Sequence, residues 1–339
     1  MAESIDSETK IKPLCPSWYD GFVADMKNLQ QQKRLPHAIL LSLPKDNDEM
    51  PFLWYFSMSL LCQDSVEGRP CRQCASCTQM LANTYPDFKP VGLEYDDSKK
   101  KYHKNIRIEQ VRELIHEVYI TRSYDNLKIA VIYPADRMSI AGANSLLKTL
   151  EEPAENALII IATHSPGKVP VTIRSRCQQW TLQLPAIEEA TSWLENQGLD
   201  NQQAVQYLNL SNANPGLALK LFQSDYLQVV SEFKQKFAQY LKNQIDVVML
   251  GQFLAAHKID LARRLIAMVV EAYCFQYCGF NESSTNKTAA RSMLELMSQI
   301  ESQLTIEENN LDLQLQLIDV LISIKQIIIK SQQPIRSRE

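Results

Sequence analysis

Four short, mostly apolar segments in the first half of the chain alternate with stretches that have helical spacing. The segments cover residues 37–43, 88–93, 128–133 and 157–163, and residues 180–184 form a weaker fifth. Helical spacing occurs between them at residues 51–61, 108–119 and 141–150. Buried strands that alternate with helices indicate a parallel sheet, because parallel strands need a crossover connection. The alternation therefore predicts an α/β domain over residues 1–185.

The second half contains no convincing strand after Pro185. Its apolar residues repeat with helical spacing at residues 187–196, 202–208, 215–222, 260–277 and 313–328. The last two stretches have wider apolar faces than one solvated helix requires, so they are expected to pack on other helices. We therefore predict two helical units, at residues 186–225 and 226–339. The second could be an autonomous bundle or a surface that joins several chains.

Charge and composition exclude some classes of protein. The 339 residues have a net charge of −4 and a pI of about 5.8, and the first 185 carry 22 basic and 22 acidic side chains. A free-standing DNA-binding domain usually has a basic stripe, so any contact with DNA is expected to be local or made through partners. No apolar run approaches a membrane span, and the acidic, polar start is unlike a signal peptide. A cytoplasmic protein is expected.

Four cysteines lie close together in the first domain. Cys62, Cys71, Cys74 and Cys77 form the pattern C-x8-C-x2-C-x2-C. Four thiolates suit tetrahedral Zn²⁺, and the short spacings let one tight turn bring them onto one ion. Because four protein ligands leave no open position, the pattern predicts a structural zinc site. Arg69 and Arg72 could offset the charge of the thiolates.

Two other interpretations of these cysteines are weaker. Unrelated thiols would not be expected to repeat the CxxC spacing. A redox CxxC normally opens a helix that follows a strand, whereas this one lies in a loop after a helical stretch. The remaining cysteines are expected to be small buried hydrophobic residues; they are Cys15, Cys177, Cys274 and Cys278.

The loop after the first strand has the position of a phosphate-binding loop but lacks its residues. Such loops have the pattern GxxxxGK[ST], whose glycines bring main-chain amides around a phosphate. Glycine is scarce in this chain, with 9 in 339 residues and none between Gly21 and Gly68. The loop carries three acidic residues, Asp46, Asp48 and Glu49, which would repel a phosphate.

The acidic pair that would hold Mg²⁺ is also missing. In ATPases of this architecture a strand ends in Asp-Glu, which binds the ion and orients water. Here the strand at residues 128–133 ends in Tyr133-Pro134, and Asp136 is expected to cap the following helix instead. The first domain is therefore predicted to have the architecture of an ATPase and to bind no ATP.

Several motifs resemble, in order and spacing, those of the bacterial DNA polymerase III clamp-loader subunits, which belong to the AAA+ family. The motifs are LPHAILL (35–41), the cysteine cluster, NSLLKTLEEP (144–153) and ATHSPGKVPVTIRSRC (162–177). The resemblance implies an AAA+ domain over 1–185, a helical lid domain over 186–225 and a helical collar domain over 226–339. Because both nucleotide motifs are degenerate, the chain is similar to the ATP-inactive delta-prime type.

The resemblance also assigns the degenerate positions. The lysine and the Ser/Thr of the phosphate loop fall on Glu49 and Met50. The acidic pair falls on Tyr133 and Pro134, and a lid arginine that senses nucleotide is replaced near Gly216. These assignments imply a chain that has no catalytic activity by itself.

The triplet Ser175-Arg176-Cys177 matches the motif by which this family completes a neighbour's ATP site. A guanidinium group can bind a γ-phosphate through two hydrogen bonds, and an arginine given in trans is worth ~10³–10⁵ in rate. The resemblance therefore implies that Arg176, with Ser175, acts on a neighbouring subunit. The alternative is a solvated surface arginine, which is the expectation for Arg174. The resemblance also places Lys148 near the neighbouring site, although it could simply pair with an acidic residue one helical turn away.

The partners that the resemblance implies are the gamma/tau and delta subunits of a heteropentamer. Through that complex the chain would help to load the sliding clamp onto primed DNA, and no membrane is involved. Two other functions stay open: an ATP-hydrolysing subunit of the same kind, and a zinc-containing DNA-binding regulator without an ATPase partner.

Overall fold

The computed structural model describes residues 15–47, 49–96, 101–120, 127–257, 259–278 and 313–332. The chain forms two compact units, residues 1–221 and 222–339, and each is described here by itself. The finer division at residues 185 and 225 stays a prediction.

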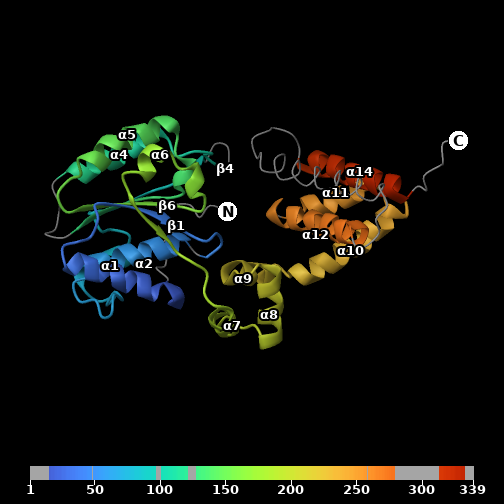
Figure 1. Ribbon diagram of the computed structural model, residues 1–339, viewed down its shortest axis with the longest axis horizontal. Coiled ribbons are helices and arrows are strands. Elements are labelled where there is room, and N and C mark those ends of the chain that lie inside the picture. The colour runs from blue at the N-terminus through green and yellow to red at the C-terminus, as the bar shows by residue number, and fades with distance from the viewer. Residues whose placement is uncertain are drawn as a thin grey trace. The chain divides into compact units, whose positions relative to one another are not determined.

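A five-stranded parallel sheet forms the centre of the first unit (Figure 1). Its strands are β1 (Ala38–Ser42), β2 (Phe88–Val91), β5 (Lys128–Ile132), β6 (Ala157–Thr163) and β7 (Gln178–Thr181). They lie in the order β2-β5-β6-β1-β7, so β1 lies between β6 and β7. A separate short hairpin consists of β3 (Tyr95–Asp96) and β4 (Lys101–Tyr102). The predicted α/β fold with a parallel sheet is confirmed.

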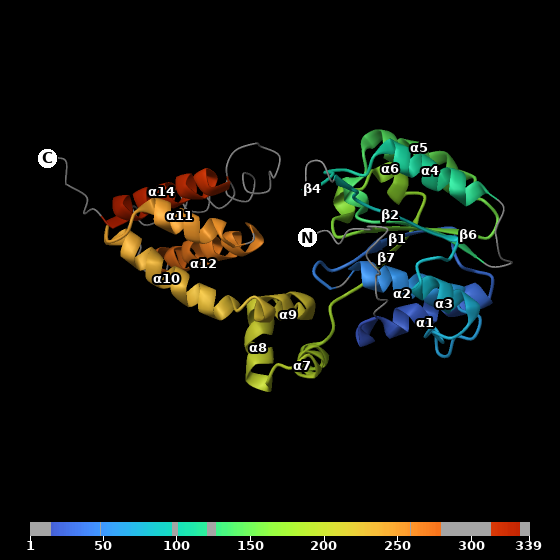
Figure 2. The same cartoon turned by 180° about the vertical axis from the view of Figure 1, so that it is seen from behind.

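Helices cover both faces of the sheet (Figure 2). One face is covered by α1 (Asp20–Gln31), α2 (Glu49–Leu61) and α3 (Ala75–Leu81), and the other by α4 (Ile108–Tyr119), α5 (Ile140–Glu151) and α6 (Val171–Arg174). Successive strand residues point to opposite faces. Accordingly, Ile39 and Leu41 join the core under α2, whereas Ala38 and Leu40 join the core under α4 and α5. Burial on both faces explains why these strands are apolar without alternation.

Three helices complete the first unit: α7 (Ile187–Asn196), α8 (Asn201–Leu210) and α9 (Pro215–Gln223). All three were expected from the sequence, and the bounds of α7 agree with the expected residues 187–196. The sequence pattern missed α1 and α3. The helix α1 buries only Val23, Met26 and Lys27, which is too narrow a face to stand out as an apolar period.

The described part of the second unit is helical. It contains α10 (Tyr226–Leu241), α11 (Val247–Ala255), α12 (Ile259–Cys278) and α14 (Leu313–Gln332). The helices α11 and α14 approach closely, and a Cβ at Gly251 would lie 2.6 Å from Cγ1 of Ile318. The amino group of Lys325 on α14 donates to the main-chain oxygen of Tyr240 at 2.7 Å. Of the cysteines that were expected to be buried, Cys274 and Cys278 have side chains that lie outside the described residues.

None of the described helices combines the length and the apolar character that are needed to span a bilayer.

Candidate functional site

The carboxyl end of β1 is where the fold would be expected to bind a nucleotide. In open α/β sheets, ligands bind at the carboxyl ends of strands where the chain reverses its direction of travel across the sheet. Here β1 lies between β6 and β7, and a loop of residues 43–48 joins it to α2, which begins at Glu49. The loop contains Asp46 in a left-handed conformation, with φ of 68°.

A buried carboxylate occupies the position that the resemblance assigned to the phosphate-loop lysine. Glu49 is 8% exposed, and its Oε1 lies 3.3 Å from the main-chain nitrogen of Asn47 and 3.4 Å from Nε2 of His164. Nδ1 of His164 lies 3.1 Å from the main-chain oxygen of Leu43, which can only accept, so Nδ1 carries the hydrogen. In the neutral ring, the hydroxyl of Tyr133 then donates to Nε2 at 2.6 Å. A phosphate at this position would meet a carboxylate instead of an ammonium group.

The first turn of α9 is hydrogen bonded directly to the β1–α2 loop. The side chains of Asn47 and Asn214 meet at 3.1 Å. Nδ2 of Asn214 donates to the main-chain oxygen of Lys45 at 2.8 Å, and the main-chain nitrogen of Gly216 donates to Oδ1 of Asn47 at 3.2 Å. We call these four residues, Lys45, Asn47, Asn214 and Gly216, the lid latch. The lid latch joins helix and loop by protein groups alone.

Only glycine fits at position 216. A Cβ there would lie 1.8 Å from the main-chain oxygen of Asp46, far inside van der Waals contact. The resemblance placed a missing nucleotide-sensing arginine near this residue, and the structure gives a steric reason for its absence. Lys220, one helical turn further along α9, pairs with the carboxylate of Asp46 at 3.3 Å. The loop and α9 are therefore too close for a nucleotide to lie between them at Gly216.

The end of β5 also lacks the groups that bind Mg²⁺. Tyr133 and Pro134 follow the strand, as the sequence shows, and Asp136 accepts a hydrogen bond of 2.6 Å from the hydroxyl of Thr163 at the end of β6. The expectation that Asp136 caps α5 is wrong. Ser139 is the N-cap, because its hydroxyl accepts from the main-chain nitrogen of Gly142 at 3.1 Å.

Arg176 lies just beyond α6 and is bonded to the end of α5. Its Nε donates to Oε1 of Glu151 at 2.8 Å, Nη2 donates to the same oxygen, and Nη1 donates to the main-chain oxygen of Thr172 at 2.9 Å. The side chains of Arg176 and Glu151 remain 34% and 50% exposed. Ser175 is exposed, and its hydroxyl donates to the oxygen of Thr172 at 3.2 Å. Arg176 is thus held at the surface by two well-placed acceptors rather than freely solvated.

Two neighbouring cations differ from Arg176. Arg174 is half-buried, and its Nε has no hydrogen-bond partner in the described part of the chain. Lys148 is exposed, and its side chain forms no hydrogen bond or ion pair with another described residue. Glu151, one helical turn away, pairs with Arg176 instead. The simple helix pair between Lys148 and Glu151 is therefore not formed.

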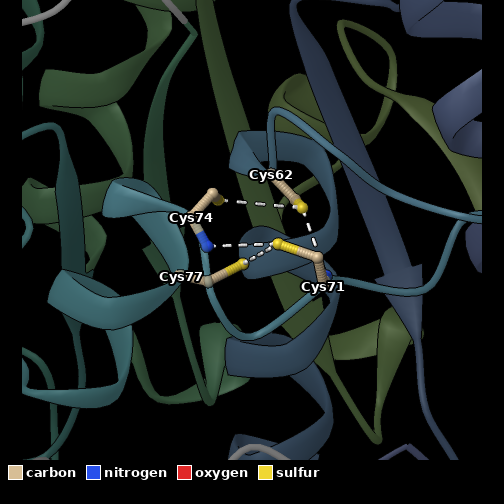
Figure 3. A group of neighbouring side chains, drawn as sticks. All are labelled: Cys62, Cys71, Cys74 and Cys77. Carbon is tan, nitrogen blue, oxygen red and sulfur yellow. Dashed lines mark hydrogen bonds between the residues drawn. The ribbon is translucent and has the colours of Figure 1, made fainter.

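The four cysteines of the predicted zinc site converge (Figure 3). Cys62 follows α2, Cys71 and Cys74 lie in the loop, and Cys77 lies in α3. Their sulfur atoms all lie within 4.8 Å of one another. Zn–S bonds of about 2.3 Å in tetrahedral geometry place sulfurs about 3.8 Å apart, and the Cys71–Cys77 and Cys62–Cys74 distances are both 4.0 Å. The donor set and its spacing fit Zn²⁺.

Main-chain N–H groups point at the sulfurs. The nitrogens of Cys74 and Gln73 lie 3.2 and 3.5 Å from Sγ of Cys71, and the nitrogen of Cys71 lies 3.3 Å from Sγ of Cys62. The donors of Gln73 and Cys74 lower the pKa of Cys71 to about 6, whereas burial raises the pKa of Cys62 and Cys77. Such donors stabilise thiolate, which is the form that binds metal.

The two described cysteine side chains outside the cluster, Cys15 and Cys177, are partly buried. Burial raises the pKa of Cys177 to about 12, and burial with the nearby charge of Asp20 raises the pKa of Cys15. Both therefore remain protonated thiols at neutral pH, in keeping with the apolar role expected for them.

Sequence reasoning missed the contacts that fill the nucleotide position. Asn47 and Asn214 are 167 residues apart in the sequence, and no motif links them. His164 and Tyr133 were part of quoted segments, but only the sheet brings their side chains to Glu49. Glu49 and Gly216 could be identified from the sequence, because each stands where the family pattern has a cationic residue.

One known family and several named proteins are similar to this sequence. The family described as "DNA polymerase III, delta subunit" matches residues 19–186. The chain is similar to proteins named DNA polymerase III subunit delta' from three bacteria. It is 30% identical to that of Pseudomonas aeruginosa over 64% of this chain and 65% of the relative, and 29% identical to that of Yersinia pestis over 80% of both. It is 32% identical to that of Escherichia coli over 65% of this chain and 66% of the relative. The matches to the first and third of these span just under two thirds of those proteins.

Proposed function

Since the chain belongs to the DNA polymerase III delta subunit family, we propose that it is a delta'-type clamp-loader subunit that binds no ATP and supplies Arg176 to a neighbouring ATPase. Its partners in this proposal are gamma/tau and delta subunits in a heteropentamer. The complex would load the sliding clamp onto primed DNA, and this chain would act as a fixed support within it. The observation that carries the proposal is the occupation of the nucleotide position by protein groups.

Three features of that position oppose ATP binding. The carboxylate of Glu49 stands where a lysine is needed. The lid latch brings α9 onto the loop, with the Gly216 nitrogen 3.2 Å from Asn47. The end of β5 presents Tyr133 and Pro134 instead of the carboxylates that hold Mg²⁺. Each feature alone would weaken the binding of a triphosphate, and the three together support the proposal that the chain binds no ATP.

Equilibrium dialysis of the purified chain with ATP and Mg²⁺ tests this part of the proposal. We expect no binding at micromolar or low millimolar ATP, with a gamma/tau subunit as the positive control. Saturable micromolar binding would instead support the first alternative, an ATP-hydrolysing clamp-loader subunit.

The surroundings of Arg176 suit an arginine that works on another subunit. Its partner Glu151 is a surface carboxylate, and exposed ion pairs contribute only about 0–1 kcal/mol. The guanidinium group can therefore exchange Glu151 for a phosphate at little cost, since both are anions that accept two hydrogen bonds. Because the nucleotide position of the described residues opposes ATP binding, the target of Arg176 in this proposal belongs to a neighbour.

Arg176→Ala in the assembled complex tests the role in trans. The variant is expected to assemble normally and to lower the ATPase rate that clamp and primed DNA stimulate, because one of the ATP sites loses its arginine. Arg174→Ala is the matched control, two residues away in the same segment, and should leave the rate close to that of the native complex. An unchanged rate in Arg176→Ala complexes of full subunit composition would refute the proposed role.

We also propose that the cysteine cluster holds a structural Zn²⁺ ion. The four sulfurs fit one tetrahedral ion, and no fifth group is needed to complete it. Metal analysis should find one zinc per native chain and far less in Cys71→Ser/Cys74→Ser, whereas the control Cys177→Ser should keep its zinc. Full zinc content in the double variant would reject the four-cysteine site.

The remaining alternative is a zinc-containing regulator that binds DNA without an ATPase partner. It predicts that the isolated chain binds duplex DNA with an affinity that falls steeply with salt. The pI of about 5.8 opposes this function. Co-purification of gamma/tau and delta subunits with the tagged chain, together with absence of duplex binding, would favour the clamp-loader proposal.

A further inference from the structure

One face of α1 contacts the cysteine loop. Asp20, Ala24 and Lys27 follow one another at spacings of four and three residues, which places their side chains on the same side of a helix. The carboxylate of Asp20 pairs with Arg69 at 2.5 Å. A Cβ at Gly68 would lie 2.6 Å from Cα of Ala24, so the loop approaches the helix as closely as glycine allows. Lys27 reaches the carboxyl end of α2, where the first cysteine of the cluster lies.

Lys27 is a buried cation that pairs with no carboxylate among the described residues. It is 8% exposed, and its Nζ donates to the main-chain oxygens of Leu60 at 3.1 Å and Cys62 at 3.0 Å. Carbonyl oxygens satisfy its hydrogens but carry no net charge, so a buried ammonium group remains costly unless an anion is near. Burial lowers the pKa of Lys27, and the nearby cysteines of the cluster, Cys62, Cys77 and Cys74, oppose that shift.

We propose that Lys27 is the countercharge of the metal centre at the cysteine cluster, an inference that rests on the zinc site proposed above. Zn²⁺ with four thiolates has a net charge of about −2, and burying that charge is costly. The ammonium group of Lys27 is buried and bonded to the main-chain oxygen of Cys62, and it offsets part of this charge. Its bond to the Cys62 oxygen also fixes the main chain that carries this ligand, as groups around metal ligands commonly do.

The two arginines that the sequence suggested for this role are placed differently. Arg69 is paired with Asp20, and its side chain is 62% exposed. Arg72 is exposed to solvent. Charges in water are screened, whereas a charge in the protein interior acts on its neighbours much more strongly. Lys27 is therefore better placed than either arginine.

Gln30 provides a control for a purely structural role of Lys27. Its Nε2 donates to the same Leu60 oxygen at 3.0 Å, but the group is neutral. If Lys27 only caps the end of α2, removing either donor should have similar effects. If Lys27 is a countercharge, only its loss should loosen the metal.

The experiment measures zinc release from the purified full-length chain to an excess of a chromogenic chelator. Lys27→Met removes the charge and keeps the length of the side chain, Lys27→Arg keeps the charge, and Gln30→Leu removes the neutral donor. We expect Lys27→Met to release zinc about 10–100 times faster than the native chain, the range found for groups that support metal ligands. Lys27→Arg and Gln30→Leu should stay within a few-fold of the native rate. If Lys27→Met does not fold, Lys27→Gln replaces it in the same comparison.

A second measurement separates metal coupling from general destabilisation. The melting temperature of each variant is compared in the native chain and in the Cys71→Ser/Cys74→Ser background. Loss of Lys27 should lower the melting temperature more with the zinc centre present than without it, whereas the effect of Gln30→Leu should be the same in both. Equal zinc-release rates for Lys27→Met and Gln30→Leu, or equal effects of Lys27→Met in both backgrounds, would overturn the proposal. Absence of zinc from the native chain would instead reject the zinc site itself.

Discussion

Gly216→Ala is the most direct perturbation of the lid latch. The added methyl carbon would lie 1.8 Å from the main-chain oxygen of Asp46 and 2.9 Å from Oδ1 of Asn47. The first of these contacts is to main chain and cannot be relieved by a change of rotamer. The chain must therefore strain the β1–α2 loop or move α9 away from it.

Straining the loop and moving α9 both cost free energy. Overpacking a close contact costs about 1–3 kcal/mol. Moving α9 away gives up three side-chain hydrogen bonds among Lys45, Asn47, Asn214 and Gly216, at about 0.5–1.5 kcal/mol each. Alanine has a higher helix propensity than glycine, which offsets up to ~1 kcal/mol of either cost. The cheaper route, the strained contact, leaves a net loss of about 1–2 kcal/mol, which is roughly a 5- to 30-fold change in an equilibrium constant.

Hydrogen exchange measured by mass spectrometry is the assay for this loss. We expect peptides from α9 and from the β1–α2 loop to exchange about 5–30 times faster in Gly216→Ala, whereas peptides from β5 and β6 should be unchanged. Gly21→Ala in α1 is the matched control, because a Cβ there has no atom within 4 Å. It should be neutral or slightly stabilising. Equal exchange of α9 in the two variants would refute the steric reasoning about the latch.

Three further predictions concern the thiol beside Arg176, a helix cap and the buried carboxylate. Because burial raises the pKa of Cys177 to about 12, its thiol should stay protonated and resist iodoacetamide in the folded chain until the pH approaches 12. In urea the thiol should react near its ordinary pKa of about 9. Peptide mapping by mass spectrometry measures the labelling, and rapid labelling of the native chain at pH 8 would contradict this prediction. Ser139→Ala removes the hydroxyl that accepts a hydrogen bond from the main-chain nitrogen of Gly142. It should lower the free energy of unfolding, measured with urea, by about 1 kcal/mol. An unchanged free energy of unfolding would contradict this prediction. Glu49→Lys restores the charge of a phosphate-loop lysine but places it against His164. The variant should therefore have a lower melting temperature and should still not bind ATP. Micromolar ATP binding by this variant would show that Glu49 alone prevents ATP from binding.

The local patterns of this sequence were sufficient for most of the secondary structure. The strand at residues 157–163 and the helix at residues 108–119 were predicted with the bounds that the structure shows. A strand buried on both faces is continuously apolar, and an amphipathic helix has a clear period, so both signals lie within a dozen neighbouring residues. The helix α1 was missed because its buried side includes Lys27, which no hydrophobic pattern would count as a core residue.

The cysteine cluster was also predictable, because short CxxC spacings force neighbouring thiols together. Its surroundings were not. The sequence favoured Arg69 and Arg72 as countercharges because they adjoin the cysteines, whereas the buried cation is Lys27, 35 residues before Cys62. Proximity in sequence is a poor guide to charge balance in a folded interior, where elements that are distant in the chain supply the neighbours.

The sequence by itself determined that this chain contains a parallel α/β sheet, a four-thiol cluster and a phosphate loop without its glycines or lysine, because each of these is a property of adjacent residues. Only the tertiary structure decided what fills the nucleotide position. A parallel sheet brings the carboxyl ends of β1, β5 and β6 to one edge, and there Glu49, His164 and Tyr133 meet. The start of the helix α9 then reaches the same edge from about 170 residues away and bonds to the loop through Asn214. Such contacts depend on how whole elements pack, and no window along the chain contains them.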